Sequence, residues 1–339
     1  MSDRDDLHHD AHDPHSHDKS RLEHGDIEDV AGHPVKDQAQ LLPVPPTDEF
    51  ATGGGRTLWG DAWYRLRKNK LAIAGLIWVI FIIAVTLSAD LWVKPIFGDP
   101  LSMDTTVGAN LQPPSADHLM GTDKLGRDVF ARVVYGARIS LTVGVIAVAI
   151  SVAIGLIMGA LSGYFGGILD TLIMRGADVF LAFPYVLFAI ALIAVLGPSY
   201  RNVFIAIGIL GWPSIARVFR SSILSVKENE YIDAARAMGA GHMRMIFRHI
   251  MPNAVAPIIV YGTMSIGGAI ITEAALSFLG MGVQPPTPSW GLMLSDARPL
   301  MVRAPWLMLW PGFAILTTVL AFVLMGDGLR DALDVKMKD

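Results

Sequence analysis

The sequence contains no cysteine and is poor in charge. Asp, Glu, Lys and Arg make up 17% of its 339 residues, whereas hydrophobic residues make up 52%. Soluble domains usually contain about a quarter charged residues, so the shortfall argues against a soluble fold. The lack of cysteine excludes a disulfide scaffold. The net charge of −4 excludes a nucleic-acid binder with a basic surface. With a mean hydropathy of +0.45, the composition indicates an integral membrane protein.

Motifs for nucleotide binding and for common hydrolytic sites are also missing. The sequence has no G-x-x-x-x-G-K-[ST] phosphate loop, no H-E-x-x-H and no G-x-S-x-G. Its apolar segments hold few ionisable residues, which proton- or ion-coupled carriers usually need. We therefore expect a chain that is not an enzyme and binds no cofactor itself. A pore-forming subunit driven by another protein fits these absences better.

The first 50 residues differ from the rest of the chain. They hold 13 acidic against 4 basic residues and carry −9, whereas residues 51–339 hold 18 against 23 and carry +5. Few large apolar side chains are present to offset the entropy of ordering, so we expect residues 1–55 to form a disordered, acidic, histidine-rich tail. Several of its histidines could bind a divalent metal ion, although a solvated tail is the simpler interpretation. These histidines are His8, His9, His12, His15 and His17.

Six apolar segments are long enough to cross a bilayer, and they predict an all-α integral membrane fold. They cover residues 71–88, 139–161, 179–200, 202–216, 254–280 and 304–326. The fourth has only 15 uncharged residues, but Arg217 and Arg220 can extend from its end to the headgroups. Buried helices of a soluble protein are an alternative that six such segments in one chain disfavour.

The distribution of Lys and Arg predicts how the spans are oriented. Residues 56–70 contain five bases in 15 positions, whereas residues 89–138 contain five in 50. The N-terminus is therefore expected in the cytoplasm and the loop 89–138 outside. With six spans, the segment 217–253 and the C-terminus are also cytoplasmic. Residues 217–248 contain six bases, which supports this orientation independently.

The segment 230–253, EYIDAARAMGAGHMRMIFRHIMPN, has the most informative pattern. Strong helix formers over residues 228–238 are followed by Gly239, which predicts the end of a helix. A second short helix is expected over about 242–251, ending at Pro252. Such a helix–glycine–helix unit could dock into a groove on a soluble partner. A basic amphipathic loop lying on the membrane fits the pattern equally well.

Five residues of this segment match the spacing of the EAA loop of ABC-transporter permeases, which reads E-A-A, three residues, G, nine residues and I-x-L-P. The matching residues are Asp233, Ala234, Ala235, Gly239 and Pro252. The sequence departs from the motif at three positions, where Asp233, His249 and Met251 stand for Glu, Ile and Leu.

Four longer segments resemble the dipeptide and oligopeptide permeases of the DppC/OppC type. They are residues 118–144, 163–184, 273–293 and 326–333, and the similarity extends over about residues 60–335. The resemblance implies a type I ABC importer permease bundle, which is MetI-like and has an extra N-terminal span. It divides the chain into an N-terminal permease region at 56–115, a transmembrane domain at 137–330 and a cytoplasmic tail at 331–339. The coupling loop, 228–252, lies within the transmembrane domain.

The resemblance also implies a complex in the cytoplasmic (inner) membrane. The expected partners, besides the lipid bilayer, are a second permease subunit, two ABC ATPase subunits that hold ATP and Mg²⁺, and an extracytoplasmic peptide-binding protein. Ala234 and Ala235 would permit close packing in the ATPase groove, and Gly239 would permit the turn. Asp233 and Arg236 would pair with charges of the partner. The residues expected to couple to the ATPase are Glu230, Asp233, Ala234, Ala235, Arg236, Gly239 and Pro252.

Cargo is less well specified by the sequence. Dipeptides or oligopeptides are expected, and nickel chelates, glutathione or another small solute are alternatives within the same family. A stand-alone channel or secondary carrier would transport without an ATPase, and a membrane metal sensor would use the histidine-rich tail. Glu273 lies about 28 Å along an ideal helix from Ala254, toward the outer end of the fifth span. It could contribute to a gate or bind a peptide amine, and a structural acid is equally consistent.

Overall fold

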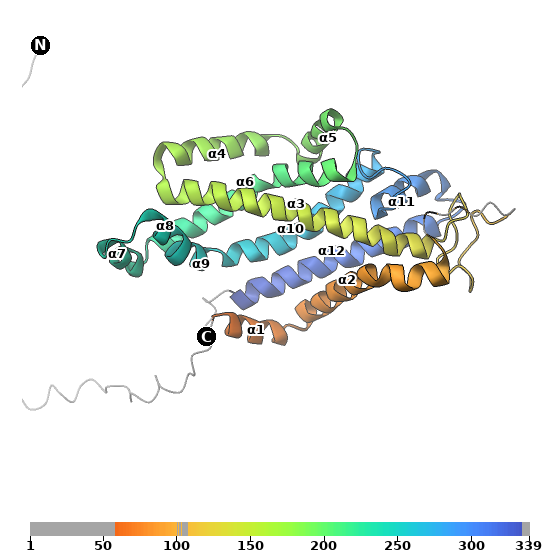
Figure 1. Cartoon of the computed structure of the whole chain (residues 1–339), viewed down its shortest axis with the longest axis horizontal. Helices are drawn as coiled ribbons and strands as arrows, with labels where there is room; N and C mark the ends of the chain where they lie inside the picture. Colours follow the sequence, from red (N-terminus) through yellow and green to blue (C-terminus); the bar gives the residue numbers. More distant parts are fainter. Residues whose placement is uncertain (1–57, 100, 102, 104–107, 334–339) are drawn as a thin grey trace, which may run out of the picture. The chain divides into compact units, whose positions relative to one another are not determined.

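The apolar segments form helices in the computed structural model, which describes residues 58–99, 101, 103 and 108–333 (Figure 1). Within these residues the structure contains no strand, and one isolated β-bridge joins Thr122 to Asp128. The histidine-rich tail lies outside the described residues. The five candidate metal ligands His8, His9, His12, His15 and His17 therefore stay an expectation from the sequence.

Five helices are long and apolar enough to cross a membrane. They are α2 (Lys70–Phe97), α3 (Val129–Phe165), α6 (Tyr200–Lys227), α10 (Ala256–Phe278) and α12 (Trp306–Leu333). A bent pair, α4 (Gly167–Ala182) and α5 (Tyr185–Leu196), completes a total of up to six crossings, which agrees with the six predicted.

The predicted third span, 179–200, is wrong as a single straight helix. α4 and α5 meet at an angle of 92°. Phe183 between them is extended, with φ −93° and ψ 142°, and Pro184 follows. Proline excludes its preceding residue from the helical region by steric clash, so the helix ends there although no charge interrupts the segment.

The predicted fourth span is also too short. α6 continues past Ala216 to Lys227. The two arginines that were expected to reach the headgroups instead bind carboxylates of α4. Arg220 donates through Nε and Nη2 to the two oxygens of Asp170, each at 2.6 Å, and Arg217 pairs with Asp178.

Glycines bring α3 and α6 into close contact. Gly155, Gly159 and Gly163 recur every four residues and face α6. A Cβ added at Gly155 would lie 2.6 Å from Cγ2 of Ile215, and one at Gly159 would lie 2.8 Å from the carbonyl oxygen of Ala216. The backbones therefore approach closely, as small-residue repeats allow in membrane helices.

Short helices gather at the two ends of α3 (Figure 1). One end, called the α7 end below, holds α7 (Glu230–Ala237), α8 (His242–Arg244), a π-helical turn (Met245–Ile250) and α9 (Met251–Ala254). The other, called the α11 end, holds α11 (Trp290–Ala297) and the 3₁₀ turn Arg298–Leu300. α1 (Leu58–Lys68) precedes α2 and packs against the end of α12. The 37 residues of α3 span about 55 Å and connect the two ends.

Candidate functional site

α7 is an amphipathic helix whose apolar face is buried in its own subunit. Ile232 is 0% exposed and Ala235 is 3% exposed. Both belong to an apolar cluster that includes Phe219 and Ile223 of α6 and Ile258 of α10. The spacing of three residues places Ile232 and Ala235 on one face of the helix. The opposite face turns Glu230, Asp233, Ala234 and Arg236 to the solvent.

The structure adds two details about the predicted coupling residues, whose role in coupling stays a prediction. Ala234 and Ala235 were both expected to pack against a partner, but Ala235 is already buried against the chain's own cluster. Asp233 and Arg236, which are expected to pair with partner charges, pair with each other in this chain, with 3.0 Å between Oδ1 and Nη1, and both stay exposed. Residues three positions apart on a helix are neighbours, so this pair forms locally.

Gly239 ends α7 in the way that its sequence position predicted. Its φ of +81° lies in the left-handed region, which glycine adopts without steric penalty. Its amide donates to the carbonyl of Arg236 at 3.0 Å, and the amide of Ala240 donates to that of Ala235 at 3.1 Å. This pair of bonds is a Schellman motif, which satisfies the last carbonyls of the helix.

Pro252 does not end the second helix of the loop. It lies at the start of α9, after the π-helical turn Met245–Ile250. The chain is helical without a break over residues 242–254, so the proline lies inside this run and not at its end. The loop also exposes large apolar side chains, which are Tyr231, Met238, Met243 and Phe247. Exposed apolar surface of this kind often marks a site of association.

Glu273 is buried between three helices near the α11 end. Its side chain is 0% exposed. Ser140 of α3 donates to Oε2 at 3.0 Å, and Ser277 of α10 donates to Oε1 at 2.7 Å. Ser289, the N-cap of α11, is a third hydrogen-bond partner. Among the described residues Glu273 forms no ion pair. In this conformation its hydrogen bonds link α3, α10 and the start of α11.

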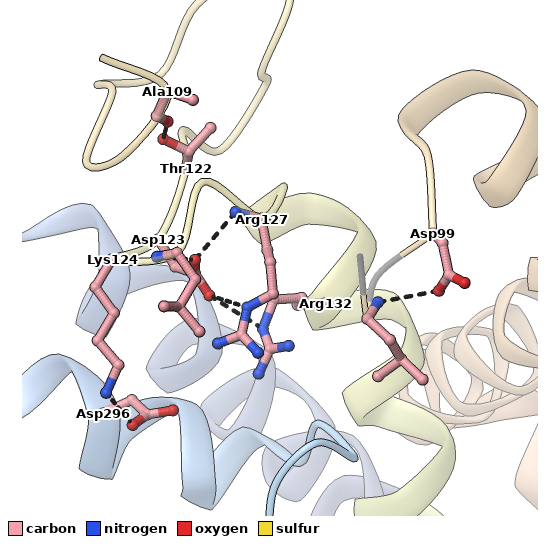
Figure 2. A network of polar contacts seen from close by, with 10 residues as sticks. Asp99, Ala109, Thr122, Asp123, Lys124, Arg127, Arg132 and Asp296 are labelled. Carbon is pink, nitrogen blue, oxygen red and sulfur yellow. Dashed lines mark hydrogen bonds and ion pairs between the residues drawn. The ribbon is translucent and has the colours of Figure 1, made fainter. Parts of the chain in front are cut away.

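The α11 end contains a buried ionic network centred on Asp123 (Figure 2). Its Oδ2 accepts from Nε of Arg127 at 2.7 Å and lies 3.5 Å from Nε of Arg132. The two arginines are only 6% and 2% exposed. At the edge of the network, Nζ of Lys124 is 2.7 Å from Oδ1 of Asp296 on α11. The network therefore ties the loop before α3 to α3 itself and to α11.

No residue of this network was singled out from the sequence. The only signal in the sequence is the spacing of Asp123, Arg127 and Arg132, in which the two bases follow the acid by four and nine residues near the start of an apolar segment. A cavity of about 20 Å³ lies beside Asp123, Lys124, Arg132 and Asp296. Its volume is that of one or two water molecules, so it does not admit an amino acid.

Comparison with known proteins identifies the family. Residues 138–339 match the binding-protein-dependent transport system inner membrane component, and residues 57–114 match the N-terminal TM domain of oligopeptide transport permease C. The chain is 48% identical over 294 residues to the dipeptide transport system permease protein DppC of Alkalihalophilus pseudofirmus, covering 87% of this chain and 94% of the relative. It is 47% identical over 283 residues to the glutathione transport system permease protein GsiD of Escherichia coli, covering 84% and 92%.

A solved structure supports the fold alone. A chain of the MetNI methionine ABC transporter aligns with a TM-score of 0.50 at 18% identity, covering 59% of this chain and 96% of that one. The predicted resemblance and the predicted all-helical importer fold are thus confirmed. The chain belongs to the binding-protein-dependent transport system inner membrane components, the permeases of ABC importers.

Proposed function

We propose that this chain is one of two permease subunits of an ATP-driven importer of dipeptides or short oligopeptides. The observation that carries the proposal is the 48% identity to a dipeptide permease over 94% of that protein's length. The similarity to a glutathione permease is almost as high, at 47%, so glutathione is the second candidate cargo. Both are small peptide-like solutes, which is why identity alone does not separate them.

The proposed complex contains a second permease, two ATPase subunits that hold ATP and Mg²⁺, and an extracytoplasmic peptide-binding protein. Apolar side chains on the outside of α4 and α5 support burial against lipid or the second permease. Ile168 of α4 and Val195 of α5 are 81% and 84% exposed. Removing such side chains from water against another apolar surface is favourable.

The α7 end is proposed to face the cytoplasm, together with both termini, in the inner membrane. The density of Lys and Arg before α2 and after α6 supports this orientation. The exposed face of α7 then meets an ATPase subunit. Ala234 is small enough for close approach, while Met238 and Phe247, which are 82% and 59% exposed, supply apolar contact area.

The mechanism follows from two arrangements of the permease pair. ATP binding closes the ATPase subunits and moves the loops of both permeases, which favours the arrangement open at the α11 end. This arrangement accepts peptide from the docked binding protein. Hydrolysis returns the pair to the arrangement open at the α7 end and releases the peptide. A ligand shifts such an equilibrium only by its different affinities for the two states.

The direct test is transport by the reconstituted complex. The chain would be purified with its partner permease, the ATPases and the binding protein, and the complex would be placed in vesicles. We expect uptake of labelled dipeptide that requires ATP and the binding protein. Uptake of glutathione with no competition by dipeptide would establish the second candidate. Uptake without the ATPase subunits would contradict the proposal and favour a stand-alone carrier.

A further inference from the structure

Two polar contacts attach the loop at the α7 end to the last turn of α3. The hydroxyl of Tyr164 lies 2.8 Å from Nδ1 of His242, the first residue of α8. Nζ of Lys227, the last residue of α6, donates to the carbonyls of Gly163 and Tyr164 at 3.3 and 3.0 Å. The loop is therefore attached to α3 at its entry and again in its middle.

The chemistry of a helix end explains these contacts. The last carbonyls of α3 have no partner within the helix, and an ammonium group satisfies them and interacts favourably with the helix dipole. The Tyr164 ring packs edge-to-face on the His242 ring, with centroids 5.7 Å apart. The Lys227 ammonium lies 5.8 Å from the Tyr164 centroid. Tyr164 thus contacts both attachment points.

The other contacts of the loop with the bundle are of a different kind. Ile232, Ala235, Met245 and Ile250 enter an apolar cluster, and such packing is non-directional. A hydrogen bond, by contrast, requires a particular distance and angle between its two partners. The Tyr164–His242 contact therefore fixes the position of the loop along α3.

We propose that Tyr164 is the positioning residue through which movement of the coupling loop is passed to α3. The inference rests on the proposed function, because it requires an ATPase that moves the loop. α3 is one continuous helix of 37 residues, and Ser140 on it donates to Glu273 near the α11 end. A displacement of its last turn is therefore transmitted along a rigid element to the opposite end of the bundle.

The substitution Tyr164→Phe tests this role in the reconstituted complex. It removes the hydroxyl and keeps the ring, so the apolar packing remains. We expect ATP hydrolysis within about twofold of wild type, an unchanged melting temperature, and peptide uptake per ATP reduced about fivefold or more. A purely structural role predicts a lower melting temperature and an unchanged ratio of uptake to hydrolysis, and that result would overturn the proposal.

A matched control is available in Tyr200→Phe. Tyr200 begins α6 and is 48% exposed, and among the described residues its hydroxyl has no hydrogen-bond partner. The same chemical change there should leave the ratio of uptake to hydrolysis at the wild-type value. A ratio that falls equally in both variants would show that loss of any tyrosine hydroxyl disturbs the complex, and it would contradict the assignment.

Substitutions at His242 examine the other side of the contact. His242→Leu should reproduce the effect of Tyr164→Phe, whereas His242→Asn keeps a hydrogen-bonding group near Nδ1 and should restore at least half of the ratio. The double variant Tyr164→Phe/His242→Leu should be no worse than either single variant, because both remove the same bond. Effects that multiply in the double variant would show two unrelated sites and would overturn the proposal.

The outcomes separate this inference from the proposed function. A wild-type complex that imports no peptide with ATP contradicts the proposed function and this inference with it. A wild-type complex that imports peptide, together with a Tyr164→Phe complex of unchanged ratio, contradicts the inference alone.

Discussion

The two ends of α3 are stabilised by opposite kinds of interaction. At the α11 end, Asp123 lies between two arginines that are 6% and 2% exposed. At the α7 end, the charged residues Asp233 and Arg236 are 69% and 59% exposed, and the loop is held by apolar packing together with the polar contacts of His242 and Lys227. Buried ionic groups tolerate little displacement because a misplaced charge remains desolvated, whereas an exposed ion pair is readily replaced by water. The difference makes the α11 end a rigid unit that moves as one body with α3, whereas the α7 end presents an exposed charged surface.

The largest effect is expected from Asp123→Asn at the α11 end. The substitution removes the negative charge that Arg127 and Arg132 share, at nearly the same side-chain volume. Removing one partner of a buried ionic group is destabilising by about 3–5 kcal/mol. Unfolding of the detergent-solubilised chain, followed by denaturant or heat, would measure it. Asp233→Asn is the matched control at the α7 end, where about 1 kcal/mol or less is expected. Equal losses would contradict the comparison of the two ends.

Glu273→Ala should have the next largest effect. The three serine hydroxyls that face the carboxylate lose a buried acceptor, and an unsatisfied buried group costs about 1–3 kcal/mol. Glu273→Gln keeps an acceptor and should preserve most of the stability.

The same pair of variants separates a structural acid from a cargo-binding one. If Glu273 only links the helices, the complex with Glu273→Gln should still import peptide at near the wild-type rate. A variant with intact stability and abolished uptake would instead assign Glu273 to a gate or to a peptide amine.

Gly239→Val should affect the α7 end at an intermediate level. A β-branched residue at φ +81° is strained by about 1–2 kcal/mol, although open space surrounds the position. We expect normal membrane insertion and weaker co-purification of the ATPase subunits. Gly239→Asn is the control, because asparagine tolerates this conformation better. Undiminished co-purification and uptake with Gly239→Val would contradict the role of this turn in coupling.

The sequence predicted the helices better than it predicted their contacts. Apolar segments of sufficient length form helices because a bilayer core leaves no other partner for backbone groups. The break at Pro184 was missed because it lies in an uninterrupted apolar segment, where hydropathy has no signal for a bend. Met238 lies at helical spacing from Ile232 and Ala235 in the sequence, but it is 82% exposed because α7 ends at Ala237.

The residues around Asp123 depended on tertiary structure. Its Oδ1 accepts from the amides of Leu125 and Arg127 at 2.8 and 3.1 Å, so the loop turns around the carboxylate and brings the arginine side chain back to it. Asp296 reaches Lys124 from 172 positions away in the chain. Sequence spacing carries information about the first of these contacts and none about the second.

The smallest effect on stability is expected from Arg236→Ala, and it tests the comparison most directly. The pair with Asp233 is exposed, so the unfolding free energy should change by less than about 1 kcal/mol. If the exposed face of α7 binds an ATPase subunit, association should nevertheless weaken several-fold, measured by titration of the ATPase onto the permease pair.

Lys124→Ala is the matched control, since Lys124 and Asp296 form a partly exposed pair at the opposite end, with exposures of 46% and 33%. Lys124→Ala should leave ATPase affinity unchanged, because Lys124 lies at the α11 end, away from the exposed face of α7. Equal loss of affinity in both variants would remove the α7 face as the site of docking.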